Sequence, residues 1–538
     1  MENSVSAVEN LEGLQEEINI LKIKISEKDD KISELELLIK WYQEKLRLEA
    51  QKKYGSSSEQ STGEQLSFFN EAEATADRKA AEQDIEQITY ERKKRAGKCG
   101  EELSLLPTET VIHELPESEQ ACPECGDKLH VMGREVRKEL TIIPAQVKVT
   151  EHIRNVYSCR GCERTGISVP IIKAHMPEPV IKGSAASASA VAHIMTQKYV
   201  THTPLYRQEQ EFIRQGIALS RQTMANWLIA ASRDWLEPIY ERLRRELMTN
   251  DVLHADETTV QVLHEPGRKA ATDSYMWLYR TSGDSKKPVA LYEYQETRSS
   301  GHIKRFLSGW KGYLHTDGYS GYHSLIDITV VGCWAHMRRK FDEALKGIPE
   351  KERGSSKAQT GLEYCNRLFA LEQVFDERLN EQTVAETPSA PDEGVKQRLN
   401  WRLKESKPIA GAFFAWAKSL NALPKSLLGA ALHYAVQQEK YLMNIYLDGR
   451  TELSNNRAER SIKPFVMGRK NWLFCNTPKG ARASSVIYSV IETAKENGLK
   501  PFEYLKFLFE AIPNSTTAQL DAFLPWSDSI PAACKLSR

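Results

Sequence analysis

The sequence predicts a multidomain α+β protein, and three observations support this fold class. A heptad repeat of aliphatic residues opens the chain, two Cys-x-x-Cys pairs follow it, and segments typical of strands and helices alternate from residue 251 onward. At 538 residues the chain is long enough for several domains. The predicted regions are a coiled coil (8–52), a polar and basic linker (53–106), a zinc-binding module (107–180), a helical region (185–250), an α/β core (251–344 with 451–500), a helical insertion (345–450) and a C-terminal segment (501–538).

Composition predicts a soluble intracellular protein. Aliphatic and aromatic residues make up 41% of the chain, and the formal net charge is zero, so any basic surface must be local. The amino terminus lacks the apolar core of a signal peptide, and no run of about 18 apolar residues is present. Of the nine cysteines, four form the two pairs and five are scattered singly, which is typical of reduced thiols with a metal site.

The heptad repeat of residues 8–52 predicts a coiled coil, most simply a dimer. Apolar residues fall seven apart, and a second series occupies the complementary positions, interrupted by Lys28. A single amphipathic helix packed on its own chain is the alternative. The two series are Leu11, Ile18, Ile25, Ile32, Ile39 and Leu46, and Leu14, Leu21, Leu35 and Tyr42.

Two Cys-x-x-Cys pairs predict a structural zinc site. Four thiolates hold Zn²⁺ tetrahedrally and leave no open position for water, whereas a redox role would not need two pairs. Short alternating segments between the pairs, such as 147–154, favour a β-rich module of the zinc-ribbon kind. The proposed ligands are Cys122, Cys125, Cys159 and Cys162. The preceding linker ends in a basic run (91–98) that is either a solvated linker or a contact for phosphates.

The region 185–250 is expected to be helical. Within it, a helix from Leu205, a turn at Gly216 and a second helix capped by Ser220 fit a helix–turn–helix, although a plain helical hairpin fits equally well. On the second helix, Arg221, Gln222 and Asn226 are the candidate DNA contacts.

From residue 251 the order of elements predicts a ribonuclease-H-like α/β core. Three strands, a helix, a fourth strand, a short helix, a fifth strand and a further helix follow one another. In that fold the first and fourth strands are neighbours. Asp256 lies on the first and Asp317 near the end of the fourth, so we expect the two carboxylates to converge. Taken singly, an aspartate at a strand end is usually a turn or cap residue.

Glu459 is the candidate third carboxylate, supplied by a later helix. It lies 142 residues after Asp317, which an inserted helical subdomain would explain. Asn455 and Asn456 are predicted to cap its helix, and a surface ion pair with Arg457 or Arg460 is the alternative role for Glu459. Three carboxylates suit two Mg²⁺ ions about 4 Å apart, which together stabilise the attacking and leaving oxygens of a phosphoryl transfer.

These motifs together resemble one family, the insertion-sequence-66-type transposases of bacteria, over nearly the whole chain. The resemblance includes the heptad region, a Tyr-Gly-Ser-Ser-Ser-Glu segment, the double Cys-x-x-Cys, His-Ala-Asp-Glu-Thr and Asp-Gly-Tyr. It continues with Cys333-Trp-Ala-His-Met-Arg-Arg339, Asn455-Asn-Arg-Ala-Glu-Arg460 and Gly468-Arg-Lys-Asn-Trp-Leu-Phe474, which are the most specific. Pro501-Phe-Glu-Tyr-Leu and Leu524-Pro-Trp526 resemble the closing segment.

The resemblance implies a DDE transposase that acts on the inverted repeats of its own element, with Asp256, Asp317 and Glu459 as the catalytic triad and ligands of Mg²⁺ or Mn²⁺. It implies double-stranded DNA as partner, a homodimer or higher oligomer, accessory proteins of the same element, no membrane, and a place in the bacterial cytoplasm at the nucleoid.

Basic residues around the triad are candidate DNA contacts. His336, Arg338 and Arg339 open the helix after the fifth strand, and a plain basic helix surface is the alternative. Arg460, Lys463, Arg469 and Lys470 flank Glu459, with Trp472 interleaved as either a base-stacking or a core residue. Two other functions stay open: a DNA-binding regulator with an inactive nuclease domain, and a nuclease of this fold without a role in transposition.

Overall fold

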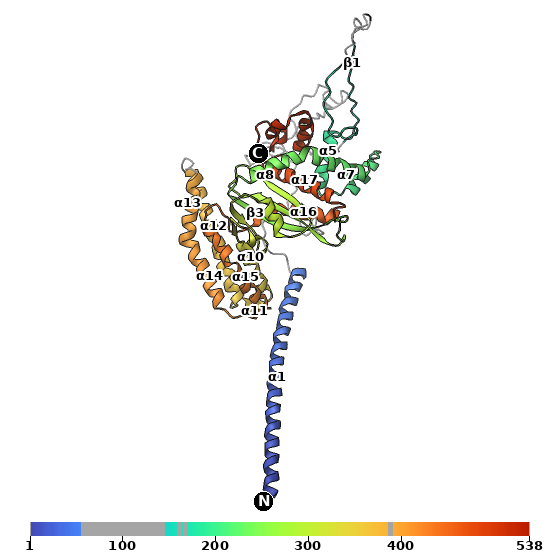
Figure 1. Ribbon diagram of the computed structural model, residues 1–538. Helices are drawn as coiled ribbons and strands as arrows, with labels where there is room; N and C mark the ends of the chain where they lie inside the picture. Colours follow the sequence, from blue (N-terminus) through green and yellow to red (C-terminus); the bar gives the residue numbers. More distant parts are fainter. Residues whose placement is uncertain (1, 55–145, 159–163, 165–170, 386–390, 537–538) are drawn as a thin grey trace, which may run out of the picture. The chain divides into compact units, whose positions relative to one another are not determined.

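The computed structural model describes residues 2–54, 146–158, 164, 171–385 and 391–536 (Figure 1). Internal contacts divide the chain into two units, residues 56–174 and residues 1–55 together with 175–538. None of the helices in the described ranges is both long and apolar enough to cross a bilayer.

In the smaller unit the described residues form one antiparallel pair, β1 (Val156–Tyr157) with β2 (Ile172–Lys173). The segment 147–154, which alternation predicts to be a strand, has no regular secondary structure. A strand needs a neighbour for its backbone hydrogen bonds, and here Val149 and Ile153 are 90% and 84% exposed. The four cysteines of the predicted zinc site, Cys122, Cys125, Cys159 and Cys162, lie outside the described residues.

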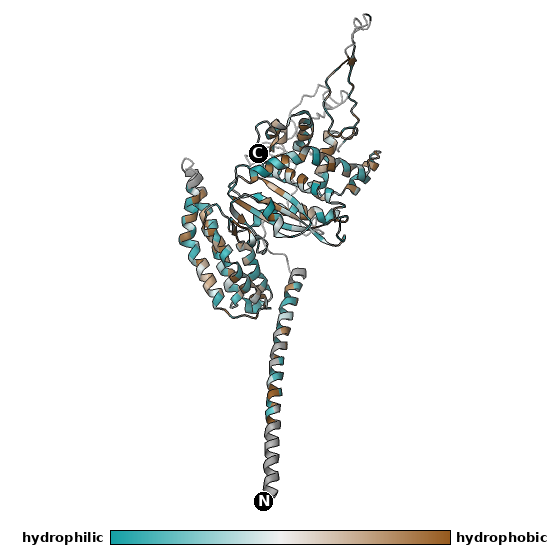
Figure 2. Cartoon of the chain, in the orientation of Figure 1, coloured by the Kyte–Doolittle hydropathy of each residue, from teal (hydrophilic) through white to brown (hydrophobic). Residues whose placement is uncertain are grey.

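The heptad region forms one continuous helix, α1 (Glu2–Tyr54). Hydrophobic residues recur along it between hydrophilic ones (Figure 2). The heptad side chains whose exposure is described, from Ile18 to Leu46, are between 47% and 63% exposed on the single chain. The helix is therefore present as predicted, and its apolar stripe faces water in the monomer.

Between residues 175 and 251 the chain forms the helices α5 (Ala188–Tyr199), α6 (Leu205–Arg214), α7 (Arg221–Ala231) and α8 (Glu237–Leu247). Ser220 caps α7 as predicted, because its hydroxyl oxygen accepts the N–H of Thr223 at 3.1 Å. Gly216 makes the turn between α6 and α7 with φ +78°, a left-handed conformation that glycine adopts without strain. A π-helical turn joins α7 to α8.

The centre of the larger unit is a mixed five-stranded sheet in the order β5-β4-β3-β6-β7. Its strands are β3 (Val252–Gln261), β4 (Asp273–Thr281), β5 (Ala290–Gln295), β6 (Gly312–His315) and β7 (Ile328–Val331). The β3–β4 and β4–β5 pairs are antiparallel, whereas β6 runs parallel to both β3 and β7. The first and fourth strands of the core are therefore adjacent, as the sequence predicts.

Helices flank this sheet and complete its core. They are α9 (Ser300–Phe306), α10 (Trp334–Lys346), α16 (Asn456–Trp472), α17 (Pro478–Glu496) and α18 (Pro501–Ala511). The inner side of α17 is buried along its length against β5, and Ser489 and Thr493 hydrogen-bond the backbone of that strand. The main hydrophobic core thus lies between the sheet, α16, α17 and the helices before β3.

The chain between α10 and α16 is a helical insertion with a hydrophobic core of its own. Its helices are α11 (Glu350–Arg353), α12 (Lys357–Ala385), α13 (Pro391–Trp401), α14 (Lys407–Ser419) and α15 (Leu427–Leu442). Trp334 and Phe341 of α10 pack on the aromatic rings of Phe413 and Trp416 in α14. Val331 of β7 belongs to this second core together with residues of α10, which connects the insertion to the edge of the sheet.

Candidate active site

Asp256 lies in the middle of β3, the central strand of the sheet. Its Oδ1 accepts the backbone N–H of Glu257 at 2.8 Å. Burial raises the pKa of Asp256 well above its ordinary value, and the negative charges of Glu257, Asp317 and Glu459 raise it further. The two distant carboxylates therefore lie near enough to Asp256 to disfavour its ionised form.

Asp317 follows β6 by two residues. In the parallel pairing of β3 with β6, His254 lies opposite His315, so two residues further along each strand Asp256 and Asp317 reach the same level. The Oδ1 of Asp317 accepts the N–H of Tyr319 at 2.9 Å, which holds the carboxylate in the turn after the strand.

Glu459 lies in the first turn of α16, with its side chain 26% exposed. Its carboxylate is 3.7 Å from Nδ1 of His336 and 3.4 Å from Nη2 of Arg339, both on α10. The Oε1 of Glu459 and the Nδ1 of His336 are buried atoms that have no hydrogen-bond partner in the structure. A buried carboxylate oxygen normally has a hydrogen-bond partner, so the unpaired Oε1 of Glu459 is available to bind a metal ion.

A fourth carboxylate, Glu257, is buried beside the site but is already paired. Arg298 donates to its Oε1 at 2.8 Å, and the hydroxyl of Tyr322 donates to its Oε2. Burial raises the pKa of Glu257, and the charge of Asp317 adds to this, while the two hydrogen bonds oppose it. Glu257 therefore adds negative charge to the site without a free ligand position.

Two buried histidines lie beneath the aspartates, and sequence reasoning did not single them out. His254 and His315 come two residues before Asp256 and Asp317, and their rings stack with centroids 4.4 Å apart. Burial lowers the pKa of His254 to about 3, and it lowers that of His315 well below the ordinary value. Both rings are therefore neutral at neutral pH. The repeated His-x-Asp spacing is the signal that could have revealed them.

Asn455 precedes α16 but does not cap it with its side chain, contrary to the prediction. Its amide instead reaches β3, where Nδ2 donates to the carbonyl of Ala255 at 2.8 Å and Oδ1 lies 2.9 Å from Nδ1 of His254. The side chain of Asn455 thus bonds His254, 201 residues away in the sequence, instead of the backbone N–H groups of the first turn of α16.

Cys333, His336 and Glu459 place one ligand atom each within 4.8 Å of one another, so they could also hold a metal. Burial raises the pKa of the Cys333 thiol to about 11, and its Sγ accepts the N–H of Asn455 at 3.2 Å. A protonated thiol is a poor ligand for Mg²⁺, which prefers oxygen. The carboxylates are therefore the better fit to a hard cation.

The residues predicted to contact DNA differ in whether their side chains are exposed or contact other parts of the protein. Arg460, Lys463 and Lys470 are exposed on α16, and Arg338 and Arg339 are exposed on α10, where Arg338 bonds Asn366. Arg469 instead bonds the hydroxyl of Thr259 at 2.8 Å, tying α16 to β3, and Trp472 packs edge-on against Phe465. On α7, the side chains of Arg221, Gln222 and Asn226 are exposed together.

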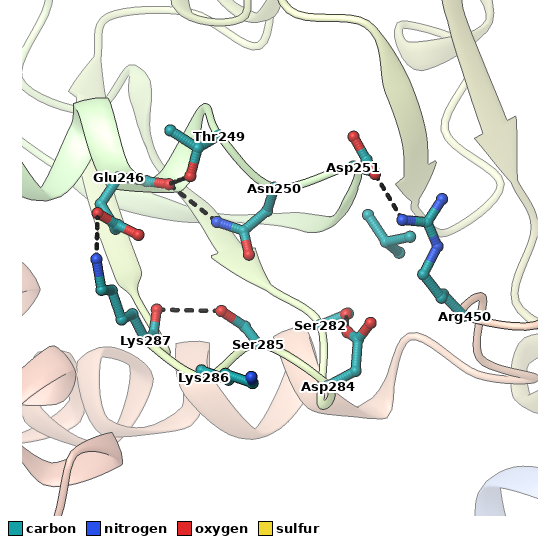
Figure 3. A pocket seen from close by; sticks show the side chains of 11 residues that line it. Glu246, Thr249, Asn250, Asp251, Ser282, Asp284, Ser285, Lys286, Lys287 and Arg450 are labelled. Carbon is teal, nitrogen blue, oxygen red and sulfur yellow. Dashed lines mark hydrogen bonds and ion pairs between the residues drawn. The ribbon is translucent and has the colours of Figure 1, made fainter. Parts of the chain in front are cut away.

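A separate pocket is lined by none of the three acids. It encloses about 350 Å³ at the beginning of β3, and Asp251 bonds Arg450 at its rim (Figure 3). Lys287 and Glu246 form a second ion pair across it at 3.3 Å. Its polar groups are largely paired with one another, so the pocket offers no set of unpaired groups for chemistry.

Comparison with known families defines the class of this protein. The model of the zinc-finger binding domain of transposase IS66 matches residues 119–163, a range that includes all four paired cysteines, and the IS66 C-terminal element matches residues 489–526. The protein is thus a transposase with a zinc-finger domain, a class that binds DNA. The largest match, to the Transposase IS66 family, covers residues 183–483, and the chain belongs to this family.

The chain is also similar to proteins of Sinorhizobium fredii. The chain is 31% identical to the uncharacterized protein y4jD over 441 residues, which is 78% of this chain and 80% of that protein. It is 28% identical to y4qI over 433 residues, or 77% and 75% of the two chains. A third similar protein, y4hP, is 28% identical over 438 residues.

Proposed function

We propose that this transposase cleaves DNA at the terminal inverted repeats of its own insertion sequence and joins the freed ends to target DNA. Asp256, Asp317 and Glu459 are the proposed catalytic triad. The observation that carries the proposal is the parallel register of β3 and β6, which brings Asp256 and Asp317 to the same level of the sheet. In support, burial and the negative charges of Glu257, Asp317 and Glu459 together raise the pKa of Asp256. The strand order further supports a ribonuclease-H-like fold for the catalytic core.

The proposed cofactor is Mg²⁺ or Mn²⁺, held as two ions by the same three residues. Mutually repelling carboxylates and the unpaired Oε1 of Glu459 suit a hard divalent cation. When bound, such ions stabilise the attacking and leaving oxygens of an in-line phosphoryl transfer. The chain itself fixes the separation of the carboxylates on a rigid sheet and helix, so that little reorganisation is needed during reaction.

The exposed cations of α10 and α16 lie on the two helices that carry His336 and Glu459, and they are the proposed contacts to the DNA backbone. Arg339 lies beside Glu459, and Arg460 and Lys463 follow it on the same helix. Cations near phosphates supply affinity and position the strand without reading its sequence. The exposed face of α7 and the zinc-finger domain, with Cys122, Cys125, Cys159 and Cys162 as proposed Zn²⁺ ligands, are the candidates for reading the ends.

The test is strand transfer in vitro with purified protein and duplexes that carry the terminal repeats. We expect nicking at the repeat end and joining to a second duplex with Mg²⁺, and neither with a chelator or with scrambled ends. Binding without any cleavage, after the accessory proteins of the element have been added, would contradict the proposal and support the regulator.

Metal binding at the triad is expected to tighten as the pH rises. Because the pKa of Asp256 is raised, a proton competes with the metal at mildly acidic pH. In the metal-free protein, this group contributes stability below its unfolded pKa and loses it as the pH rises through its folded pKa. Thermal unfolding should show a larger Mg²⁺-induced rise in Tm at mildly alkaline than at mildly acidic pH. A rise that is equal at every pH, or unchanged in Asp256→Asn, would argue against this site.

We also propose that α1 pairs with α1 of a second copy as a coiled coil, which would bring two element ends together. The exposed heptad side chains support this. Burial of one isoleucine contributes roughly 1.5–3 kcal/mol and a dimer carries each substitution twice, so Ile25→Lys or Ile32→Lys should weaken self-association by roughly 100-fold or more. Sedimentation velocity would measure the effect, with Glu27→Lys, which introduces a lysine at a position that neither belongs to the two apolar series nor flanks them, as the matched control. Equal association of all variants would place the dimer contact elsewhere.

A further inference from the structure

We propose that Asn455 is a positioning residue that sets the relative placement of the three carboxylates. The inference rests on the proposed function and deepens it, because it names the group that keeps Asp256, Asp317 and Glu459 in fixed positions relative to one another. Asn455 lies in the short segment between the helical insertion and α16, and its exposed fraction is 1%.

The first contact of Asn455 is with the strand that carries Asp256. Its Nδ2 donates to the carbonyl of Ala255, the residue immediately before Asp256, at 2.8 Å. Because this nitrogen is the amide donor, Oδ1 is the acceptor, and Nδ1 of His254 donates to it at 2.9 Å. One side chain thus holds two consecutive residues of β3.

The second contact is with Glu459 itself. The backbone carbonyl of Asn455 accepts the N–H of Glu459 at 3.2 Å, in the first turn of α16. A displacement of Asn455 would therefore move the backbone of Glu459 relative to β3. Asn455 directly connects the supports of two of the three acids.

The third connection reaches Asp317 through the stacked histidines. His254, held by Asn455, stacks on His315 of β6, and the backbone N–H of Glu452 donates to Nε2 of His315 at 3.0 Å. The segment 452–455 therefore contacts both strands beneath the aspartates. These contacts fix the lateral position of β6, and with it Asp317, relative to α16.

The same segment also holds the start of α10. The N–H of Asn455 donates to Sγ of Cys333, and the N–H of Trp334 donates to the carbonyl of Leu453 at 3.0 Å. The first turn of α10 carries His336, whose ring faces Glu459. Residues 452–455 thus join every element that contributes to the site.

The test compares Asn455→Ala with Asn444→Ala. Asn444 is a matched control, because its amide also joins the insertion to the sheet, donating to the carbonyl of Val330 on β7 at 2.8 Å, yet it contacts neither strand that carries an acid. The readout is the Mg²⁺ concentration that gives half of the metal-induced rise in Tm without DNA. The rise in Tm that Mg²⁺ still causes in Asp256→Asn is subtracted from that of each variant, so that Mg²⁺ bound at other sites does not contribute.

We expect Asn455→Ala to need about 10- to 100-fold more Mg²⁺, the usual effect of removing a group that orients metal ligands. Asn444→Ala should lose stability but keep the wild-type Mg²⁺ dependence. His254→Phe, which keeps the ring stack and loses only the bond to Oδ1, should shift the dependence in the same direction by a smaller factor, and it provides the measurement if Asn455→Ala fails to fold.

If Asn455→Ala and His254→Phe both kept the Mg²⁺ dependence of the wild-type protein, the inference would be overturned and Asn455 would have a structural role alone. A wild-type protein without any rise in Tm that depends on Asp256 would also overturn it. Failure of the proposed function is distinguishable, because a wild-type protein that binds Mg²⁺ at Asp256 but never cuts DNA still allows the comparison. In that case weaker Mg²⁺ binding by Asn455→Ala would support the positioning role on its own.

Discussion

Replacement of Asp317 by asparagine is expected to reduce DNA cleavage and joining by on the order of a thousandfold, while binding to the element ends stays nearly intact. The amide keeps the shape of the side chain and its bond to the N–H of Tyr319. It removes the charge that would hold a divalent cation, and metal stabilisation of a phosphoryl transfer is worth several kcal/mol, with about 1.4 kcal/mol for each factor of ten. Asp256→Asn and Glu459→Gln should have the same effect.

Asp273→Asn is the matched control for this series. Asp273 also lies on the sheet, at the exposed beginning of β4, and it pairs with the far end of β3 at Gln261. Its substitution should leave cleavage unchanged. A cleavage assay and a gel-shift assay on the same preparations separate loss of chemistry from loss of binding. If Asp317→Asn cut DNA at the wild-type rate, Asp317 would not belong to the triad.

Replacement of Arg402 by alanine is expected to destabilise the helical insertion by about 3–5 kcal/mol, the usual cost of leaving a buried charge without its partner. Arg402 is 1% exposed and donates to both carboxylate oxygens of Glu372, at 2.6 and 2.7 Å. It also donates to the carbonyl of Thr451 at 2.9 Å. Without Arg402, both Glu372 and the Thr451 carbonyl would lose their partner.

Arg398→Ala on the same pair of helices is the comparison. Its ion pair with Asp376 is 2.6 Å long, and its side chains are more exposed, at 27% and 55%, so its loss should cost less, about 1 kcal/mol. Hydrogen exchange would localise the effect, because the insertion has its own core and need not unfold with the sheet. Equal effects of the two substitutions would show that burial of Arg402 does not govern its contribution.

The sequence predicts the sheet and the two aspartates because both depend on local patterns. An apolar segment from Val252 identifies β3, and the order of strands places Asp256 and Asp317 on neighbouring strands. The capping rule works for Ser220, whose partner is three residues away. The capping rule fails for Asn455, because its side chain bonds β3 instead of the N–H groups at the start of α16. These partners on β3 are far away in the sequence, so no local pattern reveals them.

The remaining features of the site depend on long-range packing. His254 and His315 look like ordinary strand residues until the parallel register stacks them. Arg469 and Trp472 look suited to DNA in a basic run, yet one bonds β3 and the other packs on Phe465. Charge and aromatic character are visible in a sequence, whereas the direction of a side chain is set by the fold.

The position of the insertion has a consequence for when the protein acquires its activity. Glu459 lies 142 residues after Asp317, and residues 452–455, between the insertion and α16, bond β3 and β6. During synthesis the sheet with its two aspartates can form while the third acid has not yet left the ribosome. A nascent or truncated chain would therefore lack one of the three proposed metal ligands, and we expect no DNA cleavage by it until the insertion has folded and α16 has docked.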